Sequence, residues 1–168
     1  GKIIKGTGGV RIISNDNLVI IADKSIYNKE NLILNLEGNI SINDIKNDIK
    51  IFTNKVSYFK QKEIIVAEKK VRSEIKKKYI INSKKLIFNR NLLEISSKNK
   101  TTLEDNFGNT FSSQEFLLRI NENILSTKNL SLKDNENNDF FLENAKVDLN
   151  NNEIIGKNVS INFDNSLF

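Results

Sequence analysis

The chain has 168 residues, a formal net charge of +5 and 38% hydrophobic residues, which suits one domain with its own core. Cysteine, histidine and proline are absent, which excludes disulfides and the usual zinc and copper ligand sets, so no cofactor and no metal site is expected. The 22 lysines are scattered and far outnumber the four arginines, which favours solvated strand edges over a nucleic-acid track.

The first residues already have strand character, and a partial strand is expected over residues 9–13. Because residue 1 is glycine rather than methionine, we expect the sequence to be a piece of a longer protein.

Five similar segments follow at intervals of about 30 residues, and this repeat is the strongest signal in the sequence. In each segment a small or polar residue precedes two mostly polar ones, and then come an apolar residue, a variable one and an apolar or aromatic one. The segments cover residues 22–28, 53–59, 83–89, 113–119 and 144–150.

Each segment leads into a polar turn and then into a returning strand. Asparagine tolerates the left-handed backbone region and caps its own turn, so these stretches predict hairpins. The turns are expected at 28–31, 60–62, 89–91, 121–123 and 150–152, and the returning strands at 32–42, 64–75, 92–103, 124–132 and 154–163.

Side chains in these strands alternate with a period of two, as in an antiparallel sheet with one dry face. Leu34, Leu36, Ile40 and Ile42, for example, share a face. Ten such strands cannot leave that face open to water. The sequence therefore predicts one all-β domain over residues 1–168, an antiparallel jelly roll or V-shaped sandwich built from about five repeated hairpins.

Two other interpretations are weaker. A period of about 30 residues is also compatible with a parallel β-helix that acts as an adhesin or polysaccharide-binding module. An enzyme is not expected, because a chain without histidine has no ready base with a pKa near 7, and the Gly6–Gly9 run lacks the rest of a phosphate loop.

The phrase Ala-Asp-Lys-Ser-Ile-Tyr-Asn-Lys-Glu at 22–30, followed by Leu-Asn-Leu-Glu-Gly-Asn-Ile-Ser-Ile at 34–42, resembles the OstA-like repeat of periplasmic lipopolysaccharide-transport proteins. Within that superfamily the stretch 144–168 looks most like the end of the N-terminal periplasmic domain of the outer-membrane translocon. The chain departs from the pattern in lacking cysteine and in showing a clear Gly-Asn pair only at Gly38 and Asn39.

This resemblance implies a periplasmic domain that carries lipopolysaccharide acyl chains in an apolar groove toward the outer membrane. Its implied partners are lipopolysaccharide, other OstA-like domains such as the bridge protein, which add edge to edge, and an outer-membrane barrel following in the same chain. The implied compartment is the periplasm of a Gram-negative bacterium, as part of an outer-membrane protein, with no nucleic acid involved.

The expected groove residues are the inward apolar set, although the same residues would fill an ordinary sandwich core. They are Leu34, Leu36, Ile40, Ile42, Ile51, Val56, Tyr58, Ile65, Leu86, Phe88, Ile95, Phe116, Leu118, Leu130, Leu132, Val147, Leu149, Val159, Ile161 and Phe163. The expected docking edges, which could also reflect only where the piece was cut, are Val10, Arg11, Ile12 and Ile13 at one end and Val159, Ser160, Ile161, Asn162 and Phe163 at the other.

Overall fold

The computed structural model describes residues 1–163, so the tail at 164–168, including the 166–168 stretch used for the resemblance, lies outside the described residues. The described part consists of strands joined by tight turns, with one single-turn 3₁₀ helix, η1 Lys60–Lys62. The strands are β1 Ile3–Ile13, β2 Leu18–Asn28, β3 Ile33–Asp44, β4 Ile49–Phe59, β5 Ile64–Ile75, β6 Tyr79–Asn89, β7 Glu94–Ser97, β8 Thr101–Asp105, β9 Thr110–Ser113, β10 Glu115–Arg119, β11 Ile124–Lys133, β12 Asp139–Asp148, β13 Glu153–Lys157 and β14 Ser160–Asn162.

Every ladder among the described strands is antiparallel, and most strands pair with their neighbours in sequence. The all-β antiparallel fold is therefore confirmed, and the parallel β-helix is wrong for this chain. Two of the expected returning strands are interrupted, giving the pairs β7 and β8, and β13 and β14, and the chain through the segment at 113–119 is divided into the pair β9 and β10. Two of these pairs let six strands close into a barrel, in the order β6, β7, β10, β11, β9, β8.

The long strands bend at their middles, where the register of each ladder from β1 to β6 shifts. In β4, for example, Ile51 and Thr53 are buried, Asn54 and Lys55 are not, and Val56 and Tyr58 are buried again. A β-bulge of this kind kinks a strand and increases its twist. Each bend thus carries the chain from one layer of the fold to the facing layer.

The bend explains the repeated segments, because each segment begins at the last buried residue before the bend. Ala22, Thr53, Ser83 and Ser113 occupy this place, and all four are small and buried. For the fifth segment, the predicted first residue is two positions too late. Val147 is level with Leu125 and Leu118 in the ladders, so the fifth segment begins at residue 142, not 144.

Asparagines clamp several of these bends from the returning strand. Asn39 takes a positive φ of 43° and its side-chain amide donates to Asp23 Oδ2 at 2.9 Å. Asn129 donates in the same way to Gln114 Oε1 at 3.4 Å, and Asn158 donates to Glu143. The neighbouring Gly38 has φ of 76°, which suits glycine, and a Cβ there would require the Asp23 carboxylate to move.

The hairpin turns occur where the sequence predicts them, but asparagine does not always take the left-handed position. Asn123 and Asn152 do so, whereas Leu32, Glu63 and Leu93 hold it in the other three turns. In the first of these, Asn28 acts instead through its side chain, whose Oδ1 accepts from the Glu30 amide at 2.9 Å. The turn geometry therefore comes from loop length and side-chain capping as well as from the left-handed tolerance of asparagine.

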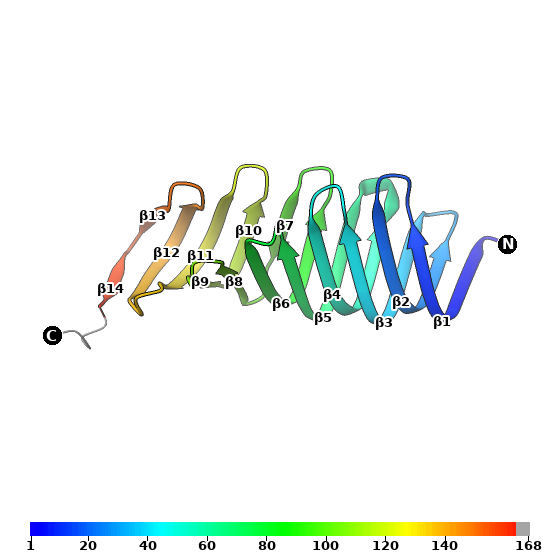
Figure 1. Cartoon of the computed structure of the whole chain (residues 1–168), viewed down its shortest axis with the longest axis horizontal. Coiled ribbons are helices and arrows are strands. Elements are labelled where there is room, and N and C mark those ends of the chain that lie inside the picture. The colour runs from blue at the N-terminus through cyan, green and yellow to red at the C-terminus, as the bar shows by residue number, and fades with distance from the viewer. Residues whose placement is uncertain (164–168) are drawn as a thin grey trace.

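The turns form two rows. We call the turns at 29–32, 60–63, 90–93, 120–123 and 149–152 turn row A, and those at 14–17, 45–48, 76–78, 106–109 and 134–138 turn row B. The half-strands next to them are the A layer and the B layer. In the half of the molecule near β1 both rows lie along the upper side and the strands bend along the lower side, so the layers face each other with the core between them (Figure 1).

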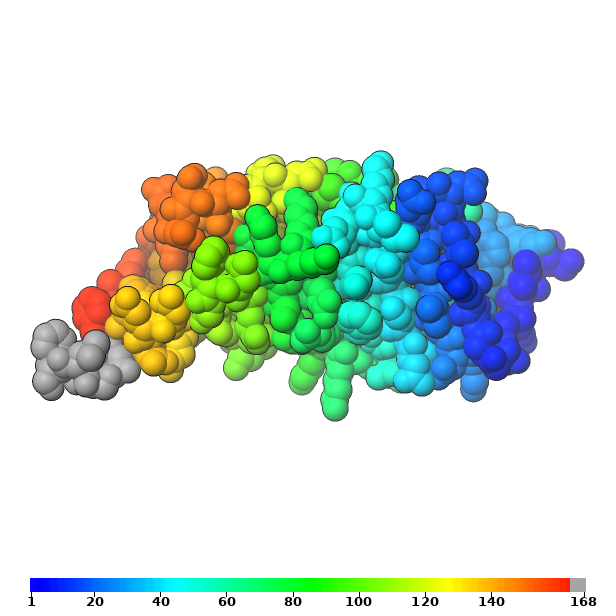
Figure 2. Space-filling view, viewed as in Figure 1, coloured from blue at the N-terminus to red at the C-terminus, as the bar shows by residue number. Residues whose placement is uncertain are grey.

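The layers repeat hairpin after hairpin, so the molecule is long, with the two ends of the described chain at opposite ends (Figure 2). Each layer contains one row of mostly apolar side chains that are ladder partners across almost every strand, and we call this row the apolar level of the layer. The level in the A layer joins Tyr27, Leu34, Tyr58, Ile65, Phe88, Ile95, Leu118, Leu125 and Val147 as successive ladder partners. The level in the B layer joins Ile12, Ile20, Ile42, Ile51, Ser73, Ile81, Leu103, Phe111, Leu132, Phe140 and Ile161.

Candidate functional site

The space between the layers opens into a cavity of about 680 Å³ at the β1 end of the molecule. Both apolar levels begin here, with Ile12 and Ile20 on one wall and Tyr27, Leu34 and Tyr58 on the other. The rim comes from both turn rows, through residues 13–16 and through Lys60 and Glu63. A cavity of this size and lining falls in the range of about 300–1,000 Å³ that is typical of small-ligand pockets.

Two features of β1 leave room for the cavity. It has a ladder partner on one side only, and it has a glycine, Gly6, where it bends. It pairs only with β2, so no further strand covers the end of the two levels. Gly6 lies where β1 bends, and a Cβ there would come within 2.8 Å of Ser25 Oγ and 2.9 Å of Val10 Cγ2. Ile4 remains half exposed, while Leu18 and Ile20 at the inner end are 1% exposed. The wall is thus largely apolar, with polar and charged side chains at the turns.

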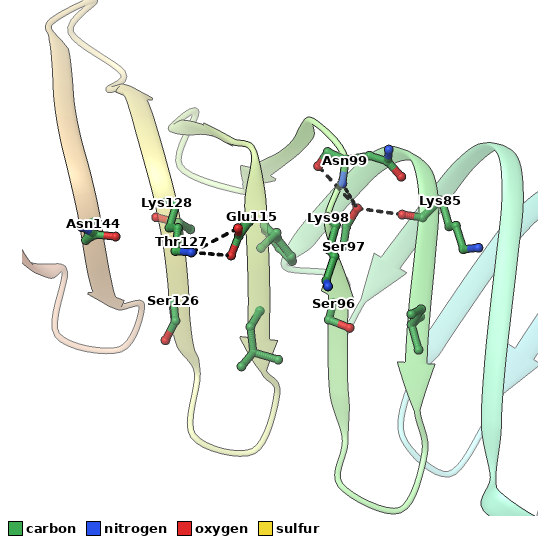
Figure 3. Close-up of a pocket in the computed structure, with 13 residues that line it drawn as sticks. Lys85, Ser96, Ser97, Lys98, Asn99, Glu115, Ser126, Thr127, Lys128 and Asn144 are labelled. Carbon is green, nitrogen blue, oxygen red and sulfur yellow. Dashed lines mark hydrogen bonds and ion pairs between the residues drawn. The ribbon is translucent and has the colours of Figure 1, made fainter.

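A second depression of about 750 Å³ lies over β6, β7, β10 and β11 (Figure 3). Several of its polar groups pair with one another, although the buried Thr127 Oγ1 has no hydrogen-bond partner among the described residues. Lys128 pairs with Glu115 at 3.1 Å, Ser97 Oγ donates to the Lys85 carbonyl at 2.8 Å, and the Asn99 amide donates to Ser97 Oγ at 3.0 Å. The cavity at the β1 end is the candidate site because it lies between the layers, where both apolar levels begin.

A buried ion cluster stands at the inner wall of this cavity. Arg90, from turn row A, reaches across to turn row B, where Nη2 lies 2.7 Å from Asp16 Oδ2 and Nε lies 3.0 Å from Asp44 Oδ2. Its Nη1 pairs with Glu63 of the neighbouring turn. Tyr58 donates its hydroxyl to Glu63 Oε2 at 2.8 Å. One guanidinium thus joins three turns and the end of β3, and so both layers.

The cluster is unequally buried. The Arg90 and Asp44 side chains are 5% and 1% exposed, whereas Glu63 is 27% and Asp16 48% exposed. Burial alone would lower the pKa of the Arg90 guanidinium, but hydrogen bonds to Asp44 and Asp16 raise it above its ordinary value. Burial and the bond to Glu63 raise the pKa of the Tyr58 phenol. The Arg90 guanidinium therefore stays charged, and the Tyr58 phenol neutral, at neutral pH.

The predicted groove residues are placed in three ways. Leu34 and Tyr58 line the cavity at the β1 end, and Phe116 borders the depression of Figure 3. The other predicted residues from Leu36 to Val147 are buried in the continuous core, and Leu149 is partly buried against it. Val159, Ile161 and Phe163, by contrast, are 54%, 46% and 65% exposed at the far end.

The predicted docking edges lie at the two ends of the sheet. Val10, Arg11, Ile12 and Ile13 belong to β1, whose only ladder is with β2. Ser160, Ile161 and Asn162 form β14, which pairs only with β12, and Val159 and Phe163 flank it. One side of each of these strands has no ladder partner within the described chain.

Sequence reasoning missed much of the cavity wall and the whole ion cluster. The strand predicted from the sequence begins only at residue 9, so it leaves out Ile4 and Gly6, although these residues already alternate with Lys5. Arg90 was treated as part of a polar turn. The residue type itself could have indicated its role. In a chain with 22 lysines, a single arginine in a turn indicates that the planar guanidinium is needed there.

Within residues 1–163 no helix is long and apolar enough to cross a membrane. No group of acidic side chains in the same range is arranged to hold a metal ion. Compared with known proteins, the chain matches no family model and no curated protein.

Proposed function

We propose that this domain binds the acyl chains of lipopolysaccharide between its two layers and guides them along its length. The observation that carries the proposal is the cavity at the β1 end, from which two facing apolar levels run along the molecule. In this view the facing layers are the V-shaped jelly roll of the OstA-like proteins, and the chain is a periplasmic domain of the outer-membrane translocon.

An acyl chain in such a space is held by burial alone, at about 0.8 kcal/mol per methylene. This attraction has no direction, so a chain can slide along a level whose side chains are almost all apolar, Ser73 of the B layer being a polar exception. Sugars and phosphates stay outside in water. Lys60 on the rim is placed to meet an anionic headgroup.

The strand edges at both ends suit the addition of like domains. An unpaired edge offers backbone N–H and C=O groups to another strand. At the β1 end the edge borders the cavity itself, so a strand added there would extend both apolar levels. We therefore propose that a bridge-type domain docks on β1 and that the next part of the same chain continues from the β14 end.

A photo-crosslinking amino acid tests this function at paired positions on neighbouring residues. Ile12 and Tyr27 line the cavity, whereas Arg11 and Ile26 point outward from the same strands. The first pair is expected to label lipopolysaccharide in solution and the second pair is not. Equal labelling at both pairs, or none at either, would refute the proposal. Ile42 and Phe88 are unsuitable probes because each is only 1% exposed.

A further inference from the structure

The interior of the molecule changes character at the ion cluster. On the β1 side of it lies the open cavity, whose wall includes Asp16, Tyr58 and Glu63. The next residues of the apolar levels beyond it, Ile65 and Ile42, do not line the cavity and are no more than 1% exposed. Arg90 contacts three of the residues that line the cavity but does not line it itself. The cluster therefore marks the inner end of the accessible space.

The same cluster holds the two turn rows together. Arg90 and Glu63 belong to turn row A, while Asp16 belongs to turn row B and Asp44 ends the strand before it. The bends keep the layers joined along the opposite side. Closure of the upper side, where the layers are not joined by backbone, thus depends on side-chain contacts, and at this point those contacts are ionic.

Ionic contacts differ from apolar packing in how they can open. Asp16 is half exposed and Glu63 about a quarter exposed, so water can replace the protein partner of either carboxylate. Such exposed pairs contribute little to stability, whereas the pair of Arg90 with Asp44 is buried. The cluster can therefore loosen on its solvent side without unfolding the layers.

We infer that Arg90, Asp16, Asp44 and Glu63 form a latch that sets the length of acyl chain the cavity accepts, an inference that rests on the proposed function. With the latch closed, a chain fills the space between β1 and Tyr58 and stops. When Asp16 and Glu63 release Arg90, the turn between β1 and β2 can move away from turn row A while the Arg90–Asp44 pair still joins the layers further in, and the chain advances onto Ile65 and Ile42. Arg90 is thus a positioning residue that acts by holding the layers together.

Fatty acids of increasing length, from octanoate to stearate, provide the probe, and titration calorimetry gives each Kd. For the unmodified protein, affinity is expected to rise about fourfold per methylene until the cavity is full and then to level off. The double variant Asp16→Asn with Glu63→Gln keeps the buried Arg90–Asp44 pair. Asp16 and Glu63 line the cavity, so the affinity of the variant for the short acids serves only as its own baseline, and its affinity should level off only at longer chains.

A matched control removes the same charge elsewhere. Glu74→Gln with Glu94→Gln breaks two exposed pairs, with Arg72 and Arg119, that do not border the cavity, and the level-off point should stay unchanged. A covalent closure gives the opposite test. Because the chain has no cysteine, Asn17→Cys, outside the cavity lining, and Asn91→Cys can be introduced into two of the turns that Arg90 joins and linked by a bismaleimide. Added to the double variant, this link should restore the original level-off point.

The outcomes separate the two proposals. If no fatty acid binds to the unmodified protein, the proposed function fails. If fatty acids bind but the level-off point is the same in the latch variant, in the control and after cross-linking, the latch is wrong and the proposed function stands. A shift in the control equal to that in the latch variant would also overturn the latch, because charge alone would then explain it.

Discussion

Arg90 is the residue on which the polar contacts of the interior converge. Its planar guanidinium pairs with Asp16, Asp44 and Glu63 at once. The single ammonium group of a lysine does not reproduce this geometry. The Lys60 and Lys62 side chains of the preceding turn are solvent-exposed by contrast. This one position shows how a polar turn in the sequence can hide a buried contact, because the sequence does not reveal which turn meets which across the layers.

Replacing Arg90 by leucine should destabilise the fold strongly, because it leaves the Asp44 carboxylate buried without a partner. The expected loss is about 3–5 kcal/mol in the free energy of unfolding, as measured by urea denaturation. Adding Asp44→Leu should recover much of the loss, since apolar packing would replace both charges.

Arg119 provides the control, because its pair with Glu94 at 3.3 Å is 39% and 27% exposed. Arg119→Leu should cost less than about 1 kcal/mol. Similar losses in the two variants would show that burial of the Arg90 cluster has no energetic consequence.

At the scale of elements, the sequence predicts the strands and hairpins well and the bends poorly. Alternation identifies a strand such as β3, where Leu34, Leu36, Ile40 and Ile42 all face the core. It does not identify the bend, because in β4 the inward residues change parity between Thr53 and Val56. The repeated segments reflect this change in the parity of the inward residues, but they do not explain it. Only the ladders show that each segment begins where a strand passes from one layer to the other.

The bend of β5 contains an unusual pair, because Lys69 and Lys70 have φ of 68° and 57°. The corresponding residues of β3 are Gly38 and Asn39, which suit the left-handed region. A left-handed conformation costs a residue other than glycine about 1–2 kcal/mol, and glycine loses about 0.5–1 kcal/mol through its greater freedom in the unfolded chain. We therefore expect Lys69→Gly to stabilise the protein by about 0.5–1 kcal/mol in thermal or urea unfolding.

A lysine in regular strand conformation gives the comparison for this change. Lys50 is exposed within β4 and its φ is not positive. Lys50→Gly should therefore destabilise by about 0.5–1 kcal/mol. If both glycine variants lost stability, the left-handed strain at the β5 bend would not be real.

For the whole molecule, the consequence of this architecture is that contacts are made almost entirely between neighbours in the row of strands. Stability in such an array is roughly a sum of local terms, and the ends open first. The latch breaks the symmetry between the two ends. It ties the turn after β1 to those after β4 and β6, whereas β13 and β14 at the other end hold only to β12. The two ends should therefore differ in stability even though both are edges.

Amide hydrogen exchange read by mass spectrometry tests this asymmetry directly. Strands β13 and β14 should exchange first, β1 and β2 later, and β4 to β6 last, since these lie inside the tied region and contain residues such as Ile65 with no exposed surface. In the Arg90→Leu, Asp44→Leu double variant, which keeps the core packed, β1 and β2 should lose their advantage over β13 and β14. Arg119→Leu should leave the order unchanged. Equal exchange at the two ends of the unmodified protein would mean that the Arg90 cluster does not couple the hairpins it touches, and that each hairpin is held by its neighbours alone.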